Sequence, residues 1–344
     1  MRSRYTIGAS IPVSKRTRVS LLILLATIAV VFLIIWSRSA EPKYQGKRIS
    51  EWLDDWAANK QTDHGSALRA IGTNALPYVA QKLAQNDSRW NRKFREWHPK
   101  LPQALQKFLP APKPVLSVVN GANAFFYVGS NSIPIAIGFL KHSSPAVREA
   151  AAWSLGSLRK QSAAAAQAIP ALIDSLRDNA RMVRFEALLS LREMGAEASN
   201  AVPAITTVLA DIRQTNDVYL RAAAAVALGK IGPSAASAIP SLKAALQETN
   251  SYLRGQTAVA IWRIASDVET ALPILLSELP ATNPHSKWDW FIALGEMGPR
   301  AKPAAPLLRA DLTRIKESWI LQYITNALLK IEAEVPSRPL DSPQ

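Results

Sequence analysis

The chain has 344 residues, of which 48% are hydrophobic and 19% are charged, and this composition excludes a fully disordered protein. Its 41 Lys and Arg residues outnumber its 26 Asp and Glu residues, so the formal net charge is +15. A positive charge of this size makes nucleic acid, anionic lipid and acidic proteins candidate partners. The absence of cysteine excludes disulfides, thiolate metal sites, a cysteine nucleophile and a lipidated N-terminal cysteine.

The first strong signal is an apolar segment, residues 19–36, which contains no charge and only Ser20 and Thr27 as polar residues. At about 1.5 Å per residue, a helix of this length spans roughly 27 Å, close to the hydrocarbon core of a bilayer. We therefore predict a basic cytoplasmic tail at 1–18, a transmembrane anchor at 19–36 and a polar tether at 37–48.

The charges around this segment predict its orientation. Five basic residues and no acidic residue precede it: Arg2, Arg4, Lys15, Arg16 and Arg18. By the positive-inside rule the N-terminus stays inside, although basic residues also follow the segment and weaken the signal. A cleaved signal peptide is the alternative, but its cleavage site would include Arg38, which is unfavourable. Either outcome places residues 41–344 outside, so we predict a single-pass protein of the inner (cytoplasmic) membrane whose main domain is periplasmic.

An internal repeat fills the rest of the chain. A small-apolar-Pro pattern recurs every 33 to 37 residues, with prolines at Pro134, Pro170, Pro203, Pro240, Pro273 and Pro306. A Val-Arg or Leu-Arg pair keeps the same period and contributes Arg148, Arg184, Arg221 and Arg254. Three units also contain a glycine about eight residues before the next proline: Gly195, Gly232 and Gly298.

Each unit is predicted to form two helices, as residues 167–195 illustrate. The first helix has apolar residues at helical spacing, and Pro170 is tolerated because it lies in the first turn. Asp178 and Asn179 form the turn and offer an N-cap to the second helix. Gly195 is expected to end that helix in a left-handed cap. Because one pair cannot bury its apolar face alone, such pairs stack and share one continuous core.

The repeat pattern resembles HEAT-type α-solenoids, particularly the bacterial HEAT-like repeats also found in phycobilin lyases. The matching pattern is A-[IV]-P-x-[LI], then [VL]-R-x-x-[AT], then a closing [AL]-L-x-x-[IM]-G. Lys287 and Leu321 replace the arginine in two units, and Ala265 replaces one closing glycine. The segment 44–56 resembles the entry helix of membrane-tethered or exported bacterial HEAT-repeat proteins.

The resemblance implies an all-α solenoid over 49–333, preceded by one transmembrane helix and followed by a flexible tail at 334–344. About eight helix pairs are expected, at 49–72, 75–129, 131–159, 164–195, 199–231, 236–266, 269–297 and 301–333.

An insertion at 87–114 interrupts the second pair. Its aromatic residues alternate with basic ones, namely Arg89, Trp90, Arg92, Lys93, Phe94, Arg95, Trp97, Lys100, Lys107 and Phe108. This pattern suits nucleic acid, anionic lipid headgroups or an acidic partner. The interpretation that we favour at this point is an irregular helical insert whose aromatic rings pack on the solenoid while its cations stay solvated. We therefore expect little nucleic-acid binding, since the predicted topology places this segment outside the cytoplasm.

The sequence contains no arrangement typical of catalysis or metal binding. The four histidines, His64, His98, His142 and His285, fall in different units, each in or beside a turn or insertion where side chains are usually exposed. No pair has metal-ligand spacing, and neither a phosphate-binding loop nor a nucleophile elbow is present. Ser157 and Lys160 match S-x-x-K by a short pattern that arises readily by chance, and adjacent Asp54 and Asp55 point about 100° apart on a helix. We predict no catalytic residue, cofactor or metal.

The four repeat arginines, Arg148, Arg184, Arg221 and Arg254, have two interpretations. They form either a row that binds an acidic ligand or, as we favour, structural contacts to turn carbonyls and to neighbouring acids such as Asp178 or Asp217. The second helices also contain Trp153, Trp262, Trp288, Trp290 and Trp319. We expect most of these to be core residues and one or two to be exposed as anchors for a partner.

These observations predict a membrane-anchored, extracytoplasmic, non-catalytic scaffold that binds a protein or peptide in a concave groove lined by the second helices. One alternative is an enzyme or enzyme accessory of the HEAT-like class, lyase-like or DNA-glycosylase-like, for which Trp288-Asp289 is the only suggestive pair. The other is an anionic-lipid or envelope surface role for 87–114. Of the +15 charge, residues 1–48 carry +8 and residues 87–114 carry +5, so the repeats are nearly neutral.

Overall fold

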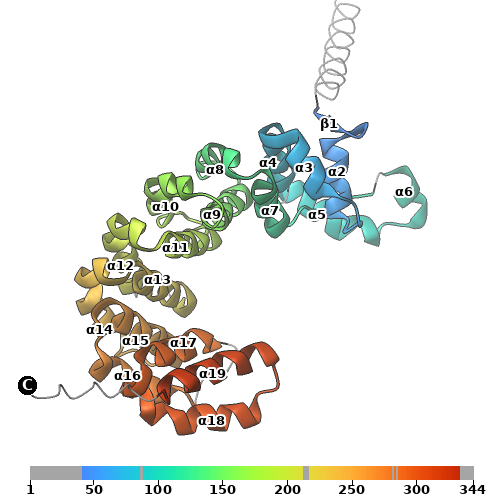
Figure 1. Cartoon of the computed structure of the whole chain (residues 1–344). Coiled ribbons are helices and arrows are strands. Elements are labelled where there is room, and N and C mark those ends of the chain that lie inside the picture. The colour runs from blue at the N-terminus through green and yellow to red at the C-terminus, as the bar shows by residue number, and fades with distance from the viewer. Residues whose placement is uncertain are drawn as a thin grey trace, which may run out of the picture.

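The computed structural model describes residues 41–333 apart from 86–87, 110, 212–216, 281–282 and 284–285. The predicted cytoplasmic tail, transmembrane anchor and C-terminal tail lie outside the described residues. Within them the chain is an all-α helical-repeat solenoid, as the sequence predicted, and it curves into an arc (Figure 1).

A short hairpin and two helix pairs begin the solenoid. The hairpin, β1 (Lys43–Tyr44) with β2 (Lys47–Arg48), lies within the segment that we predicted to be a polar tether. The first pair is α2 (Ile49–Ala57) with α3 (His64–Ile71), and the second is α4 (Leu76–Ala84) with α7 (Val118–Val128). The insertion between α4 and α7 contains α5 (Arg89–Trp97) and α6 (Gln103–Phe108).

Six regular helix pairs make up the remainder. Their first helices are α8 (Ile133–Phe139), α10 (Ile169–Ser175), α12 (Val202–Ala210), α14 (Ile239–Ala245), α16 (Val268–Glu278) and α18 (Ala305–Arg314). Their second helices are α9 (Pro145–Arg159), α11 (Arg181–Met194), α13 (Val218–Ile231), α15 (Ser251–Ala265), α17 (Trp288–Met297) and α19 (Ser318–Ile331). The second helices form the inner side of the arc and the first helices the outer side (Figure 1).

Glycine and proline set the junction between consecutive pairs. Gly195 ends α11 with φ 60° and ψ −135°, and Gly232 ends α13 with φ 76° and ψ −146°. Gly195 has the positive φ that we expected, but its ψ is negative, whereas the left-handed helical cap that we predicted requires a positive ψ. The predicted cap is therefore wrong. The chain instead enters the mirror image of the extended region, which glycine adopts without a Cβ clash, and passes directly into a 3₁₀ helix, η5 (Gly195–Ala201).

Small residues allow neighbouring second helices to pack closely. A Cβ on Gly229 of α13 would lie 2.9 Å from the Cα of Ala260 in α15, and one on Gly156 of α9 would lie 3.0 Å from the Cα of Ser190 in α11. All four alanines at 222–225 are buried. Glycine and alanine are therefore part of the stacking surface.

One helical stretch within the described residues, Val218–Ala245, is long and apolar enough to cross a membrane by length and composition. It consists of α13, η6 (Gly232–Ala238) and α14, which bend apart at Gly232. Half of its most apolar window is buried, as is usual for core helices of a repeat.

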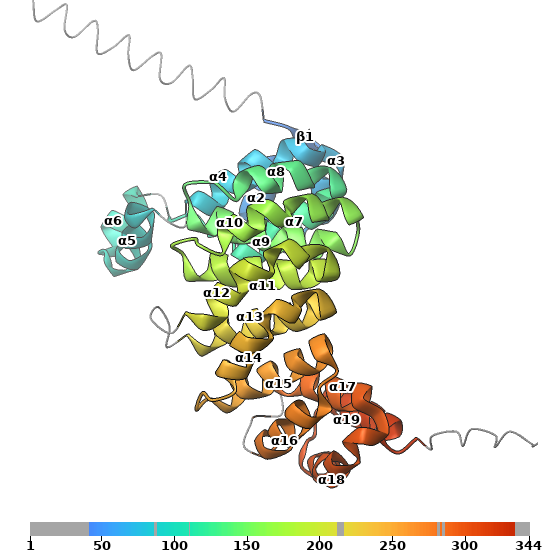
Figure 2. The same ribbon diagram turned by 90° about the vertical axis from the view of Figure 1, so that its left-hand side faces the viewer.

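The insertion departs from the solenoid. Helices α5 and α6 stand off the side of the first repeats, near the end of the arc where β1 begins (Figures 1 and 2). No residue of α5 is buried.

Candidate functional site: a groove on the inner face

The inner face of the arc is built from one face of each second helix. In α11 the buried residues, such as Val183, Ala187 and Leu191, face the first helices and the neighbouring repeats. On the opposite side lie Met182, Leu189 and Glu193, which are exposed or half-buried. Leu189 follows Met182 by 7 residues and Glu193 follows it by 11, so all three share one face of the helix. The same spacing recurs in each second helix, so the inner face consists of parallel rows that run from repeat to repeat.

We define three rows by their position relative to the repeat arginine. The aromatic row, two residues before it, contains Met182, Tyr219, Tyr252 and Trp319. The middle row, five residues after it, contains Trp153, Leu189, Val226, Val259 and Ile292. The charged row, nine residues after it, contains Glu193, Lys230, Arg263, Glu296 and Lys330. At the two ends of the arc the pattern is weaker, because Ala146 and Ser157 of α9 and Asn326 of α19 occupy the corresponding positions. A groove with one aromatic edge, an apolar floor and one charged edge follows from this register.

The aromatic row exposes large side chains that a soluble core would bury. Tyr219 is 67% exposed and Trp319 is 46% exposed. The ring centroids of Tyr219 and Tyr252 are 5.9 Å apart, although they come from adjacent repeats. At the C-terminal end, Tyr323 lies 6.2 Å from Trp288 and 6.3 Å from Trp319, which makes a cluster of three rings. Exposed Tyr and Trp in such a row are typical of interaction surfaces.

The tryptophans that the sequence singled out separate into two groups. Trp262 and Trp290 are buried, and Trp290 packs directly over Gly255. Trp288 and Trp319 are exposed on the inner face, and Trp153 is half-buried there. A helix turns about 200° between Trp288 and Trp290, so one faces the groove and the other faces the core.

A hollow of about 200 Å³ lies in the groove between α9 and α11. Its lining includes Trp153 and Glu186, together with the charged residues Lys160, Arg192 and Glu193. Burial of Glu186, together with the nearby Glu149, raises the pKa of Glu186 to about 7. Glu186 is 8% exposed, and the nearby charge of Arg192 offsets only part of this rise in its pKa. A buried carboxyl group in this state is costly to charge, and a cationic group from a partner would offset that cost.

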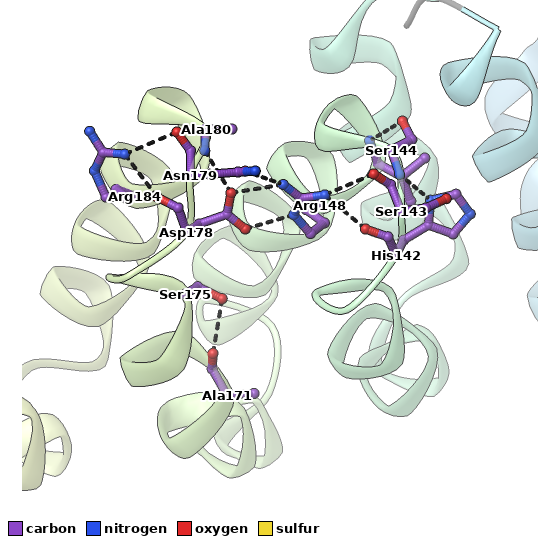
Figure 3. A network of polar contacts seen from close by, with 11 residues as sticks. His142, Ser143, Ser144, Arg148, Ala171, Ser175, Asp178, Asn179, Ala180 and Arg184 are labelled. Carbon is purple, nitrogen blue, oxygen red and sulfur yellow. Dashed lines mark hydrogen bonds and ion pairs between the residues drawn. The ribbon is translucent and has the colours of Figure 1, made fainter. Parts of the chain in front are cut away.

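The repeat arginines donate hydrogen bonds to the turns between repeats, as Figure 3 shows for Arg148 and Arg184. Arg148 donates from Nε and Nη2 to the two carboxylate oxygens of Asp178 in the next repeat, at 2.6 and 2.8 Å. Its Nη1 donates to the carbonyls of His142 and Ser143 in its own turn, at 2.9 and 3.0 Å. One side chain thus joins two successive turns.

The other arginines make related contacts with different partners. Arg184 donates to the carbonyl of Asp178 at 2.8 Å, and Arg221 donates to Glu248 Oε1 in the next turn at 2.8 Å. Arg254 joins Glu278 to the carbonyl of Glu248, which is 2.6 Å from its Nη1.

Asp217, one of the acids that we expected to meet a repeat arginine, is bonded by Arg181 instead. The hydrogen bonds from Arg181 lower the pKa of Asp217.

Lys287, which replaces the arginine in one unit, has a similar structural contact. It is fully buried, and its ammonium group lies 3.7 Å from Asp311 and donates to the carbonyl of Leu279. Burial lowers the pKa of Lys287. The replacement keeps a cation between two turns, which is consistent with the interpretation of these positions as structural.

The groups considered for catalysis are dispersed. Asp55 pairs with Lys47 and Lys60, whereas Asp54 pairs with Lys82 and Lys113. Within the part of the chain that the structure describes, no three His, Asp or Glu side chains are grouped to hold a metal.

The described histidines are in separate packing contacts. His64 stacks on Trp56 at 4.9 Å, and burial lowers its pKa. His98 lies beside Phe94 and is buried, so the exposure that we expected for it is wrong. His285 lies outside the described residues.

The insertion differs from the interpretation that we favoured. Trp90, Trp97 and Phe108 are 68%, 54% and 86% exposed, so these aromatic side chains do not pack on the solenoid. On α5 the basic side chains Arg89, Arg92, Lys93 and Arg95 lie beside and opposite the aromatic face. The expectation that the rings would be buried is therefore wrong, because α5 makes no buried contact with the repeats.

Comparison with known families agrees with this architecture. The HEAT repeat family matches residues 127–192 and 169–262. Residues 127–262 therefore carry HEAT repeats.

Its structural neighbours are helical solenoids of low sequence identity. Kap121p superposes with a TM-score of 0.52 and 14% identity, over 82% of this chain and 33% of Kap121p. The complex of CpcE and CpcF of phycocyanin lyase from Nostoc sp. PCC7120 superposes with a TM-score of 0.44 and 20% identity, over 67% of this chain and 98% of that chain. No curated protein sequence matches the chain.

Proposed function

We propose that the chain is a membrane-anchored, extracytoplasmic scaffold whose HEAT repeats bind an extended segment of a partner protein in the inner groove. The observation that carries this proposal is the aromatic row, which places the exposed side chains of Met182, Tyr219 and Trp319 and the half-buried ring of Tyr252 along one edge of the groove. The apolar segment at 19–36 and the basic residues before it support the anchor and its orientation.

The register of the groove indicates the form of the ligand. Adjacent helices pack about 8–10 Å apart, and an extended chain rises about 3.3 Å per residue. A bound segment would therefore advance by about three residues per repeat and place every third side chain over the aromatic row. The repeats from Met182 to Trp319 would accommodate a segment of roughly 12 to 15 residues. Near Trp153 the buried carboxyl group of Glu186 favours a lysine or arginine in that segment.

Site-specific photocrosslinking tests the groove. A photoreactive amino acid in place of Tyr219 faces the groove, and the same substitution at Thr207, an exposed residue of the outer helix α12, is the matched control. We expect a crosslinked partner from position 219 and not from position 207, with its yield reduced at least fivefold by Trp319→Ala. Equal crosslinking from both faces, or no effect of Trp319→Ala, would contradict the groove.

A reporter fused after Gln344 tests the topology independently of the groove. Alkaline phosphatase, which folds only in an oxidising compartment, is expected to be active in this fusion, and a fluorescent protein that requires the cytoplasm is expected to be dark. The opposite pattern would place the repeats in the cytoplasm and would return the enzyme class of HEAT-like proteins to consideration.

A further inference from the structure

Exposed large hydrophobic side chains are concentrated in residues 88–109, which we call the insert. Among the described residues, five of the thirteen such side chains lie in this short segment: Trp90, Trp97, Leu105, Phe108 and Leu109. Other described parts of the chain leave each of them at least 39% exposed. A face of this kind on a nearly neutral solenoid marks an interaction surface.

The geometry of α5 is that of an interfacial helix. Trp90, Phe94 and Trp97 follow each other at spacings of four and three residues and share one face, and the rings of Trp90 and Phe94 are stacked at 6.4 Å. The basic residues flank and oppose that face, so their long side chains can reach headgroups while the rings enter the interface.

The same face is hollowed in a way that suits an amphiphile. A hollow of about 410 Å³ is lined by Trp90, Phe94 and Trp97 together with Lys93, Glu96 and Lys100. Its walls are mostly apolar rings, and its charged groups are two ammonium groups and one carboxylate. The rings suit an acyl chain, and the excess of one positive charge suits an anionic headgroup.

We propose that the insert docks on an anionic membrane surface and thereby gives the solenoid a second attachment beside its anchor. The proposal rests on the proposed anchor at 19–36, which fixes the distance. Only six residues separate Trp36 from Lys43 of β1, so the start of the fold lies within about 25 Å of the segment's end. The insert is at this end of the arc (Figures 1 and 2).

Proximity and charge together favour lipid over a soluble acidic protein. Because the anchor holds the chain on the membrane, the insert encounters the lipid surface at a high effective concentration. A soluble partner has no such advantage. Each basic residue near an anionic surface contributes about a fivefold gain in affinity, and α5 alone has four. Trp at the level of the headgroups adds an uncharged contribution that salt does not screen.

Hydrogen exchange of the full chain in lipid nanodiscs tests the proposal. We expect the amides of 89–100 to exchange at least tenfold more slowly in discs with 30% phosphatidylglycerol than in pure phosphatidylcholine discs, while those of α13 exchange equally in both. Trp90→Ala/Trp97→Ala and Arg92→Glu/Lys93→Glu should each bring the difference to within about twofold. Leu329→Ala/Arg309→Glu, which changes one exposed apolar and one exposed basic residue elsewhere, should leave it intact.

The outcomes separate the insert from the anchor. Equal exchange in both kinds of disc, from a chain that copurifies with both, would overturn lipid docking and leave the anchor standing. Failure to copurify with phosphatidylcholine discs would contradict the anchor, and protection that appears only after a soluble acidic protein is added would replace lipid by that class of partner. Because the substituted residues are exposed, the variants are expected to fold normally.

Discussion

Gly255 of α15 lies against the indole of Trp290, and this contact gives a quantitative test of how the repeats stack. A Cβ at Gly255 would lie 1.9 Å from Cζ2 of Trp290, which is fully buried. Gly255→Ala therefore forces the indole to move within a packed core, at a cost near the upper end of the usual 1–3 kcal/mol for overpacking. The gain in helix propensity offsets about 1 kcal/mol, so we expect a net loss of about 2 kcal/mol in the free energy of unfolding.

A matched variant isolates the steric effect from the propensity effect. Gly138 is also helical and has no atom within 4 Å of an added Cβ. Gly138→Ala should stabilise the chain by about 0.5–1 kcal/mol. Urea unfolding followed by circular dichroism, together with hydrogen exchange of α15 and α17, measures both variants.

A double-mutant cycle decides whether the clash is the cause. In a Trp290→Ala background the space above Gly255 is empty, so Gly255→Ala should there be neutral or slightly stabilising, with a coupling of about 2–3 kcal/mol. A loss of the same size in both backgrounds, or a stabilising Gly255→Ala in the wild-type chain, would refute the reasoning.

Three further predictions concern charge and backbone. Asp289→Ala leaves the buried guanidinium of Arg263 without its bidentate partner at 2.7 and 2.8 Å and should cost about 3 kcal/mol in urea unfolding, most of it regained by Arg263→Met in the same chain. The pKa of Glu186, raised by burial and by Glu149 to about 7, lies above the unfolded value of 4.5, so stability should fall by up to about 3 kcal/mol as pH rises between these values. Glu186→Gln should abolish that pH dependence of the urea midpoint. Gly232→Ala places a Cβ at φ 76° and should cost about 1–2 kcal/mol in the same assay, whereas a neutral effect would show that the junction relaxes freely.

Local periodicity predicted the repeat fold because helix pairs are specified by nearby residues. Prolines recur where a helix begins and no backbone donor is needed, as Pro170 and Pro203 do at the second positions of α10 and α12. Glycines recur where φ must be positive, as at Gly195. The alanines at 222–225 mark a helix that its neighbours approach closely on several sides. Each of these features depends on residues within one or two turns.

The candidate site was only partly predictable. The sequence indicated that some tryptophans of the second helices would be exposed, and the repeat phase contains the signal that places Met182, Tyr219, Tyr252 and Trp319 in one row. That signal was missed because the row mixes residue types, with a methionine among its aromatic residues. The raised pKa of Glu186 had no sequence signal, since it arises from burial between α9 and α11.

The sequence by itself determined that helices pair, that the pairs repeat every 33 to 37 residues, and that one basic, aromatic insert interrupts them. Only the tertiary structure decided that Asp217 binds Arg181 while Arg221 binds Glu248, because the reach of a side chain depends on how one repeat is rotated against the next. Only the tertiary structure showed that the rings of α5 are exposed. An amphipathic helix has the same sequence whether its apolar face packs on its own chain or awaits another surface, and that difference is set by segments distant in sequence.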